Sequence, residues 1–282
     1  DYALAWCGVA EHCYLMGNFG FLPPRESMPR AKAAALRAIE FDQTLAEAHS
    51  MLGIVRALFD FDWAEAETEF RRALELNPAS PSTRERYSFC FLRPMKRLDE
   101  AVAEMERALQ QDPLSLAIQS RLAYTLHLQG CPDRAIAQLQ AALELAPDSY
   151  WVYWLLGVVY GGKGMLEEAV AAFERCCELS RRSALTVGLL GAAYAMAGRR
   201  EEAEKLLLEL HERSPRGYVP PLSIAWIYVG LQDLDRAFEW LEKADEARDP
   251  ILAGHLNTEP VYDVLRSDPR YHSLLRKMNL EP

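Results

Sequence analysis

The stretch Tyr153-Trp-Leu-Leu-Gly157-Val-Val-Tyr160 reappears 34 residues later as Val187-Gly-Leu-Leu-Gly191-Ala-Ala-Tyr194. Each copy is followed, at the same offsets, by a glycine, an alanine and a large apolar residue: Gly164, Ala169 and Phe173, then Gly198, Ala203 and Leu207. A fixed interval of this length is the signature of a chain built from one repeated supersecondary unit.

The alanine keeps its interval across most of the chain. Five copies are spaced by 34 residues, and two more continue the series upstream at steps of 35: Ala31, Ala66, Ala101, Ala135, Ala169, Ala203 and Ala237. The residue four positions later is apolar in every copy, and the third position beyond that is again small or apolar. Residues at i, i+4 and i+7 share one face of a helix, so the series predicts a repeated amphipathic helix.

Two kinds of glycine complete the unit. Gly157 and Gly191 stand inside the first helix of a copy, where the missing Cβ lets a second helix approach closely. Gly130, Gly164 and Gly198 follow the first helix, where the chain needs a left-handed residue to turn. Each copy is therefore predicted to be a helix hairpin that buries its apolar face only by stacking on its neighbours.

This pattern resembles the tetratricopeptide repeat. The resemblance implies an all-α fold, a right-handed α-solenoid of about seven helix hairpins closed by a C-terminal capping helix. We expect the array to span 1–247, with a long insertion at 18–30 in the first repeat, and the capping segment to span 248–282. Because the chain opens on residues typical of a repeat's first helix, we expect further sequence before Asp1.

Composition narrows the choice of partners. The 282-residue chain has a formal net charge of -10, which argues against direct nucleic-acid binding because that would require clustered Lys and Arg. The uncharged run 183–198 is too short for a membrane span. Six cysteines without Cys-x-x-Cys spacing fit reduced thiols in a cytoplasmic protein.

A binding surface is expected on the leading helices, which the resemblance places along a concave groove. The groove face should include Tyr124 and Trp226. Within it we predict an aromatic wall, Trp151 and Trp154, beside a floor of small residues, Gly188, Ala192 and Ala195. A bulky apolar side chain of a partner would fit between wall and floor. The alternative is that the Trp rings pack between successive helices of the repeat array itself.

Three arginines form a second candidate. Arg86 and Arg93 are seven residues apart, hence on one helical face, and Arg121 falls on the next leading helix. Converging guanidinium groups would hold a carboxylate or an acidic segment. The alternative is that each pairs with the abundant Asp and Glu.

No catalytic constellation is present, and we expect neither enzymatic activity, nor a cofactor, nor a metal. Gly161-Gly162-Lys163-Gly164 lacks the strand before it and the hydroxyl residue after it that a phosphate loop requires. Cys7, His12 and Cys13 are spread around a helix and cannot converge on one ion.

The sequence therefore predicts a non-enzymatic scaffold for a protein or peptide. It is similar to the tetratricopeptide arrays at the C-terminal ends of bacterial signalling proteins, which follow winged-helix, adenylate cyclase or Ser/Thr kinase domains. This similarity implies a regulatory or sensing region. The alternative function is self-association, for instance as a homodimer that oligomerises the parent protein.

Overall fold

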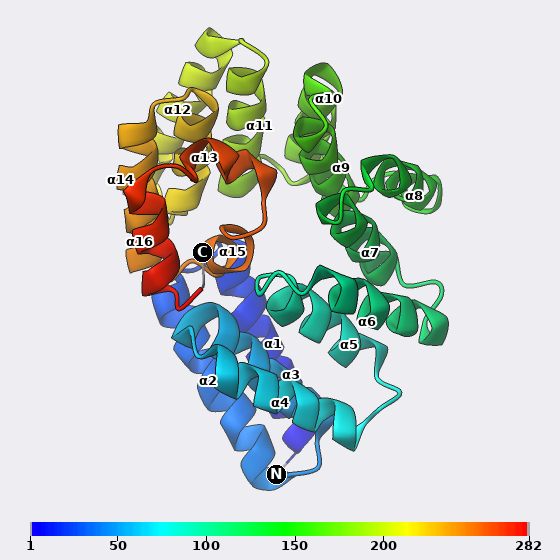
Figure 1. Ribbon diagram of the computed structural model, residues 1–282. Helices are drawn as coiled ribbons and strands as arrows, with labels where there is room; N and C mark the ends of the chain where they lie inside the picture. The colour runs from blue at the N-terminus through cyan, green and yellow to red at the C-terminus, as the bar shows by residue number, and fades with distance from the viewer. Residues whose placement is uncertain (1, 281–282) are drawn as a thin grey trace. The chain divides into compact units, whose positions relative to one another are not determined.

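The computed structural model describes residues 2–280, and all regular structure within that range is helical (Figure 1). Consecutive helices are joined by short turns and pack on each other as hairpins, among them α1 with α2, α9 with α10, and α13 with α14. The predicted fold class, an all-α stack of helix hairpins, is confirmed.

The chain divides into two compact units. The first comprises the described residues of 2–118, 247–258 and 275–280, and the second comprises 119–246 and 259–274. The division into an array at 1–247 and a capping segment at 248–282 stays a prediction.

The first unit contains α1 (Ala3–Asn18), α2 (Pro24–Phe41), α3 (Ala46–Val55), η1 (Arg56–Asp60), α4 (Trp63–Leu76), α5 (Pro81–Tyr87), η2 (Ser88–Leu92), α6 (Leu98–Gln111) and α15 (Pro250–His255). The second contains α8 (Pro132–Leu145), α9 (Tyr150–Gly162), α10 (Leu166–Leu179), α11 (Ala184–Met196), α12 (Arg200–Arg213), η3 (Ser214–Arg216), α13 (Pro221–Gly230), α14 (Leu234–Glu246) and η4 (Pro260–Leu265). Two helices cross a boundary between the units: α7 (Leu116–Leu128) and α16 (Pro269–Lys277).

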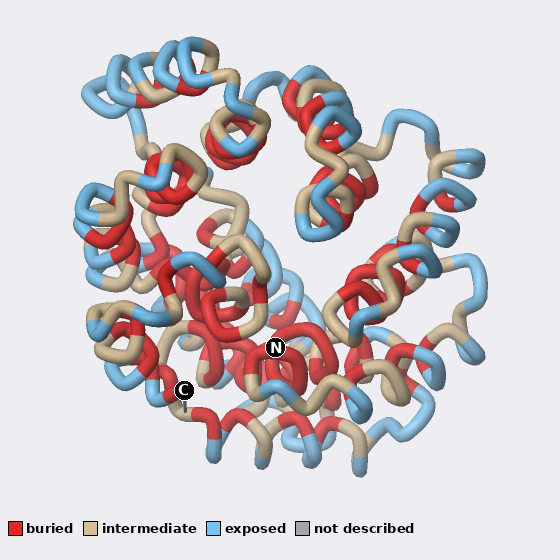
Figure 2. Tube along the Cα trace, turned by 45° about the horizontal axis from the view of Figure 1, so that its top comes forward, coloured by how far each residue is buried: buried red, intermediate tan, exposed pale blue. Residues whose placement is uncertain are grey.

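The periodic alanines lie in the core, as their spacing predicts. All seven are between 0 and 2% exposed: Ala31, Ala66, Ala101, Ala135, Ala169, Ala203 and Ala237. Figure 2 shows the buried residues along the sides where helices face one another, with exposed residues on the outer sides. Small side chains at these positions let the two helices of a hairpin approach and interlock with their larger neighbours.

The turns between paired helices repeat one backbone conformation. Gly130, Gly164 and Gly198 have φ of 85°, 78° and 77°, which confirms the predicted left-handed turn. The same place in three other hairpins is held by residues with a side chain, Phe61, Lys96 and Gln232, at φ of 60°, 56° and 58°. An L residue there carries strain that glycine avoids.

The two 35-residue steps have a local cause. One π-helical turn, Arg56–Asp60, precedes Ala66, and a second, Ser88–Leu92, precedes Ala101. A π-turn fits one more residue into the same helical advance than an α-turn does. The extra residue of each long repeat is thus absorbed inside its first helix, and the second helix keeps its phase.

The segment 18–30 differs from expectation, since only its first part is a loop. Helix α1 runs to Asn18 and α2 already begins at Pro24. Proline fits the first turn of a helix because its φ is preset and its missing N–H is not needed there. Pro23 is the N-cap residue of α2 and Pro24 its first residue, so the adjacent prolines start the helix.

Candidate functional site

Four of the predicted site residues form a continuous aromatic ladder in the second unit. The Arg121 guanidinium lies 5.7 Å from the Trp151 ring centroid, and Trp151 lies 5.7 Å from Trp154. Trp154 then meets Trp226 edge to face, with centroids 6.2 Å apart and ring planes at 85°. These distances and angles are those at which cation–π and aromatic pairs attract.

The ladder ends on a residue that sequence reasoning missed. Trp226 Nε1–H donates to the hydroxyl oxygen of Tyr262 over 2.9 Å, and Tyr262 is fully buried. Tyr262 belongs to η4, which lies alongside α13 and also contacts α9 (Figure 1). The sequence offered two weak signals for this contact. Pro260 is a residue that can start a short helix, and Tyr262 and Leu265 are large residues three positions apart, which places them on one face of it.

Most of the ladder lies inside the protein. Trp154 and Trp226 are each 5% exposed, whereas Arg121 and Trp151 are half-buried. The two inner rings therefore pack between helices, and the ladder reaches the surface at Arg121 and Trp151. Tyr124, which was also predicted to line the groove, is 1% exposed.

The small residues predicted as the floor of the groove, Gly188 and Ala192, lie at a helix–helix contact. A Cβ added at Gly188 would lie 2.4 Å from the carbonyl oxygen of Ser223, and one added at Gly230 would lie 2.7 Å from that of Ala192. Helices α11 and α13 therefore approach until their backbones touch at Gly188 and Ala192.

The three predicted arginines have separate surroundings. Arg86 donates to Ser50 and pairs with Glu11 over 2.6 Å. Arg93 is 1% exposed, and its guanidinium lies 4.2 Å from the Phe89 ring centroid. The π-turn Ser88–Leu92 stands between them, so seven residues no longer equal two α-helical turns.

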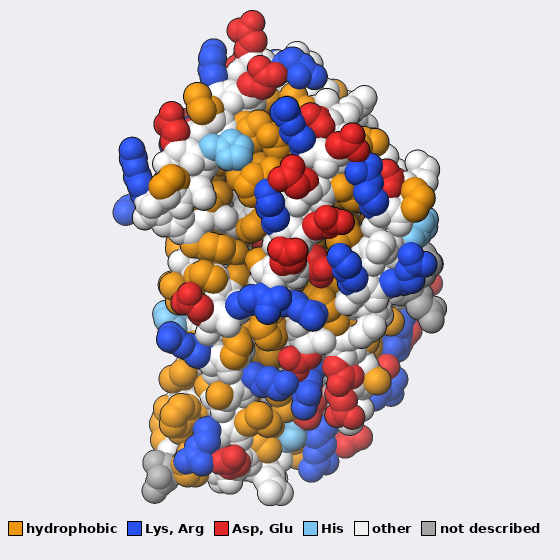
Figure 3. Space-filling model, turned by 90° about the vertical axis from the view of Figure 1, so that its left-hand side faces the viewer, with side chains coloured by type: hydrophobic (Ala, Val, Ile, Leu, Met, Phe, Trp, Pro, Cys, Tyr) orange, Lys and Arg blue, Asp and Glu red, His pale blue; other side chains and the backbone are white. Residues whose placement is uncertain are grey.

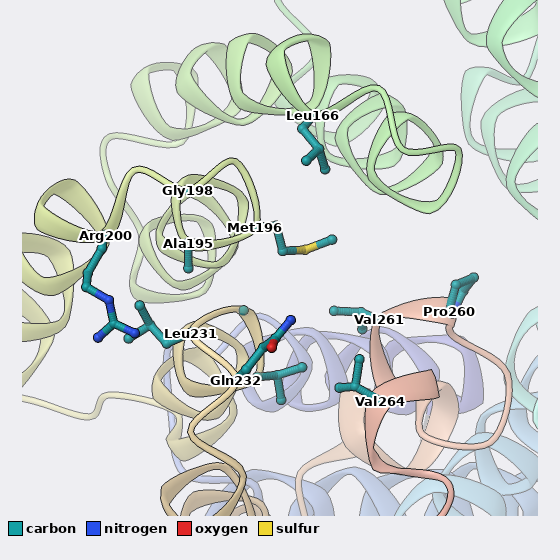
Figure 4. Close-up of a pocket in the computed structure, with 12 residues that line it drawn as sticks. Leu166, Ala195, Met196, Gly198, Arg200, Leu231, Gln232, Pro260, Val261 and Val264 are labelled. Atoms are coloured by element: carbon teal, nitrogen blue, oxygen red, sulfur yellow. The ribbon is translucent and has the colours of Figure 1, made fainter.

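The second unit also has an open apolar pocket of about 430 Å³ (Figure 4). In the figure Met196 of α11 and Val261 of η4 point toward each other across it, with Leu166 of α10 above. Most of its lining is apolar: Leu166, Ala195, Met196, Gly198, Arg200, Val229, Gly230, Leu231, Gln232, Pro260, Val261 and Val264. Met196 and Val264 are 39% and 47% exposed, so the pocket opens to solvent between them.

One buried polar group near this surface is unsatisfied. His127 is 7% exposed, and neither of its ring nitrogens has a hydrogen-bond partner within the protein. Burial lowers the pKa of His127, so the ring is neutral at physiological pH. Its Tyr124 neighbour offers a ring contact, with centroids 6.4 Å apart.

Within residues 2–280 no cluster of three His, Cys, Asp or Glu is placed to hold a metal ion. No helix in the same range combines the length and the apolar character that crossing a membrane requires.

Comparison with known proteins places these features in a family. A family model described as tetratricopeptide repeat matches residues 114–182, and a second with the same description matches 222–249. Among curated proteins none matches the chain in sequence.

Solved structures resemble the chain in fold at low sequence identity. The human IFIT1 dimer with m7Gppp-AAAA has a TM-score of 0.64 at 18% identity, covering 90% of this chain and 67% of IFIT1. A thermophilic TPR protein of Thermus thermophilus has a TM-score of 0.59 at 17% identity, covering 68% of this chain and 98% of its own. The type IV pilus biogenesis factor PilW has a TM-score of 0.58 at 19% identity, covering 76% of this chain and 94% of PilW.

The periodic buried alanines, the left-handed turns and both family matches agree on one conclusion. The chain carries tetratricopeptide repeats at residues 114–182 and 222–249.

Proposed function

We propose that the protein is a non-enzymatic scaffold that binds a segment of another protein on the surface formed by α10, α11, α13 and η4. The observation that carries this proposal is the apolar pocket of about 430 Å³, one wall of which is η4, the turn whose Tyr262 accepts from Trp226. Partially exposed Met196 and Val264 at its mouth offer apolar surface to a partner. Aromatic and Met side chains are enriched at the centres of protein interfaces, where a partner's apolar side chain gains most from burial.

Affinity capture with matched variants tests the pocket. Met196→Glu places a charge at the pocket mouth, whereas Leu208→Glu places one on α12, where Leu208 is already 59% exposed and lies outside the pocket. We expect Met196→Glu to lose the proteins that the wild-type chain captures, and Leu208→Glu to keep them. Identical captured sets from all three chains would remove the pocket as the binding site.

The sequence similarity supports a more specific version, in which the chain is the cytoplasmic regulatory or sensing region of a larger bacterial signalling protein. The sequence of the gene upstream of Asp1 tests it. A winged-helix, cyclase or kinase domain encoded in the same reading frame is expected, and a start codon immediately before Asp1 would contradict this version.

Self-association is a second candidate, favoured by the exposed apolar side chains on the outer face of α1. The large ones are Leu4, Trp6, Val9 and Leu15, at 47, 37, 45 and 39% exposed, and Tyr2 just before the helix is 64% exposed. Terminal repeats normally need a polar outer face to remain soluble, and contiguous exposed apolar surface marks an interaction site. On the face shown in Figure 3, acidic and basic side chains are interspersed, and hydrophobic side chains gather between them in the upper middle and along the left edge.

The occupant of this face would be the same face of a second copy, because two-fold pairing is the commonest way in which one patch covers itself. Sedimentation of wild-type chain and Leu4→Glu/Val9→Glu tests the pairing. We expect a concentration-dependent dimer that the double variant dissociates. A wild-type chain that stays monomeric at high concentration would exclude this candidate.

A further inference from the structure

The segment Glu259–Leu265, which we call the tail turn, fills part of the surface on which the proposed function rests. Pro260 begins its helical turn, and Tyr262 and Leu265 are fully buried. These two residues are three apart, which is one turn of a 3₁₀-helix, so they share one face. Val264, on another face, is 47% exposed. The tail turn thus presents a Tyr and a Leu to the repeat helices.

The seat of Tyr262 distinguishes Tyr from Phe. Trp226 Nε1–H points at the hydroxyl oxygen over 2.9 Å, and the Trp226 ring is held edge-on by Trp154. A buried donor of this kind loses its partner when the ligand lacks the hydroxyl, and such sites reject the analogue. The seat has the properties of a recognition site for a tyrosine.

The tail turn fits this surface incompletely at His127. A Cβ added at Gly162 would lie 2.8 Å from His127 Nε2 and 3.7 Å from Pro260 Cγ, so both residues border the same point. The imidazole there is buried without a hydrogen bond. An unsatisfied buried polar group destabilises the closed arrangement.

The tail turn also leaves apolar surface uncovered. Val261 and Val264 line the open pocket without filling it, and Met196 across the pocket stays 39% exposed. A segment with a larger apolar side chain at either valine position would bury more of Met196 and Leu166 than the tail turn does.

We propose that the surface beneath the tail turn is a binding site for a Pro-x-Tyr-x-x-Leu segment of a partner protein, and that the tail turn occupies this site in cis. This inference rests on the proposed function and adds the chemistry of the ligand. The partner segment carries tyrosine for Trp226, a proline that starts its helical turn, and a bulky apolar residue that reaches the pocket. It takes the place of the tail turn when it binds.

Because the tail turn competes for the site, it determines how tightly a partner segment must bind. A tethered segment acts at an effective concentration in the millimolar range for a short linker. A competing segment binds only to molecules whose tail turn is displaced, so its apparent Kd is its intrinsic Kd divided by the fraction of such molecules. A variant with a weakened tail turn therefore binds the same competitor more tightly.

A fluorescein-labelled peptide with the sequence of residues 257–268 is the probe, titrated by fluorescence anisotropy into the full chain. We expect weak binding to wild type, tighter binding to Tyr262→Phe, and binding at least about 10-fold tighter to Tyr262→Ala. Tyr271→Phe in the neighbouring α16 removes a hydroxyl that accepts from Arg266, and this control should bind the probe as wild type does. Circular dichroism checks that each variant is folded, and Tyr262→Phe, which keeps the ring, decides the outcome if Tyr262→Ala is unfolded.

A second probe, in which the tyrosine corresponding to Tyr262 is phenylalanine, tests the chemistry of the seat. We expect it to bind the weakened variant at least fivefold less tightly than the tyrosine probe does. Equal binding of both probes, or equal binding of the tyrosine probe by wild type and the Tyr262 variants, overturns the proposal. If the Met196→Glu variant loses its partners while the probe fails, the proposed function stands and this inference falls.

Discussion

Trp226 donates its indole N–H to the hydroxyl of Tyr262 across 36 residues of sequence, at 2.9 Å and out of contact with solvent. Replacing Tyr262 by Phe would leave this buried donor without its acceptor, and an orphaned donor costs about 1–3 kcal/mol. We expect Tyr262→Phe to lower the free energy of unfolding by about 1–2 kcal/mol in urea denaturation followed by Trp fluorescence. The Tyr160 hydroxyl accepts from Gln140 in an exposed hydrogen bond, so Tyr160→Phe should stay within about 0.5 kcal/mol of wild type. An equal decrease in the free energy of unfolding of both variants would show that the hydrogen bond from Trp226 stabilises the fold no more than an exposed one does.

Glycine at the contact of α11 and α13 is predicted to be irreplaceable. A methyl group at position 188 would collide with the Ser223 backbone, which cannot rotate away, so we expect Gly188→Ala to destabilise the chain by about 2–3 kcal/mol. At Gly161 the nearest atom to an added Cβ is Ala169 Cβ at 4.0 Å, an ordinary contact. Gly161→Ala should therefore be neutral or stabilising by up to about 1 kcal/mol, as the helix propensities of the two residues predict. Thermal melts of the two variants measure the difference. A similar loss of stability in both would contradict the close approach of α11 and α13 at Gly188.

Left-handed turn residues offer a stabilising change. Gln232 has φ of 58° and is exposed, so Gln232→Gly removes backbone strain and should stabilise the chain by about 0.5–1 kcal/mol. Gly198 holds the equivalent place one repeat earlier at φ of 77°, and Gly198→Ala should destabilise it by about 1 kcal/mol. Opposite signs in chemical denaturation are the expected result. A loss of stability in Gln232→Gly would mean that its side chain contributes more than its backbone strain costs.

Asp249 gives the first unit a pH dependence of unusual sign. Its carboxylate caps α15 by accepting from the N–H groups of Ile251 and Leu252, yet it is only 4% exposed. Burial raises its pKa from 3.8 to about 6, although the two N–H groups oppose this. Between these pH values Asp249 is protonated in the folded chain and ionised in the unfolded chain. Its contribution to the free energy of unfolding is therefore fully present at low pH and is lost as the pH rises to about 6.

Asp249→Asn tests this directly, because asparagine caps a helix equally well and carries no charge. We expect the variant to be more stable than wild type above pH 6 by up to about 3 kcal/mol, and the difference to vanish near pH 4. Urea denaturation across this range measures it. A pH-independent difference would mean that Asp249 does not titrate in the folded chain.

The sequence predicted the hairpins because their determinants are local. A small residue every 34 positions with an apolar one four later defines a helical face whatever surrounds it, and Ala135 or Ala203 needed no knowledge of distant contacts. The turn glycines were predictable for the same reason. Phe61 and Gln232 were less visible as turn residues, because tertiary packing holds each in a conformation that its own propensity disfavours.

The site was harder, because its decisive contact is long-range. Trp151, Trp154 and Trp226 were predicted from their repeat positions, and the structure joins them in one ladder. Tyr262 stands outside the repeat phase, so no periodicity could indicate that it meets Trp226. Arg86 and Arg93 illustrate a local failure of prediction. Their spacing of seven residues predicts one helical face, but the π-turn between them rotates one relative to the other.

The two π-turns have a consequence for how arrays of this kind change in length. An inserted residue accommodated within a helix leaves the downstream units undisturbed, so an insertion or deletion need not be matched by any change elsewhere. Positions 56–60 and 88–92 are thus natural places for length polymorphism, and an engineer shortening the array by one residue would begin there.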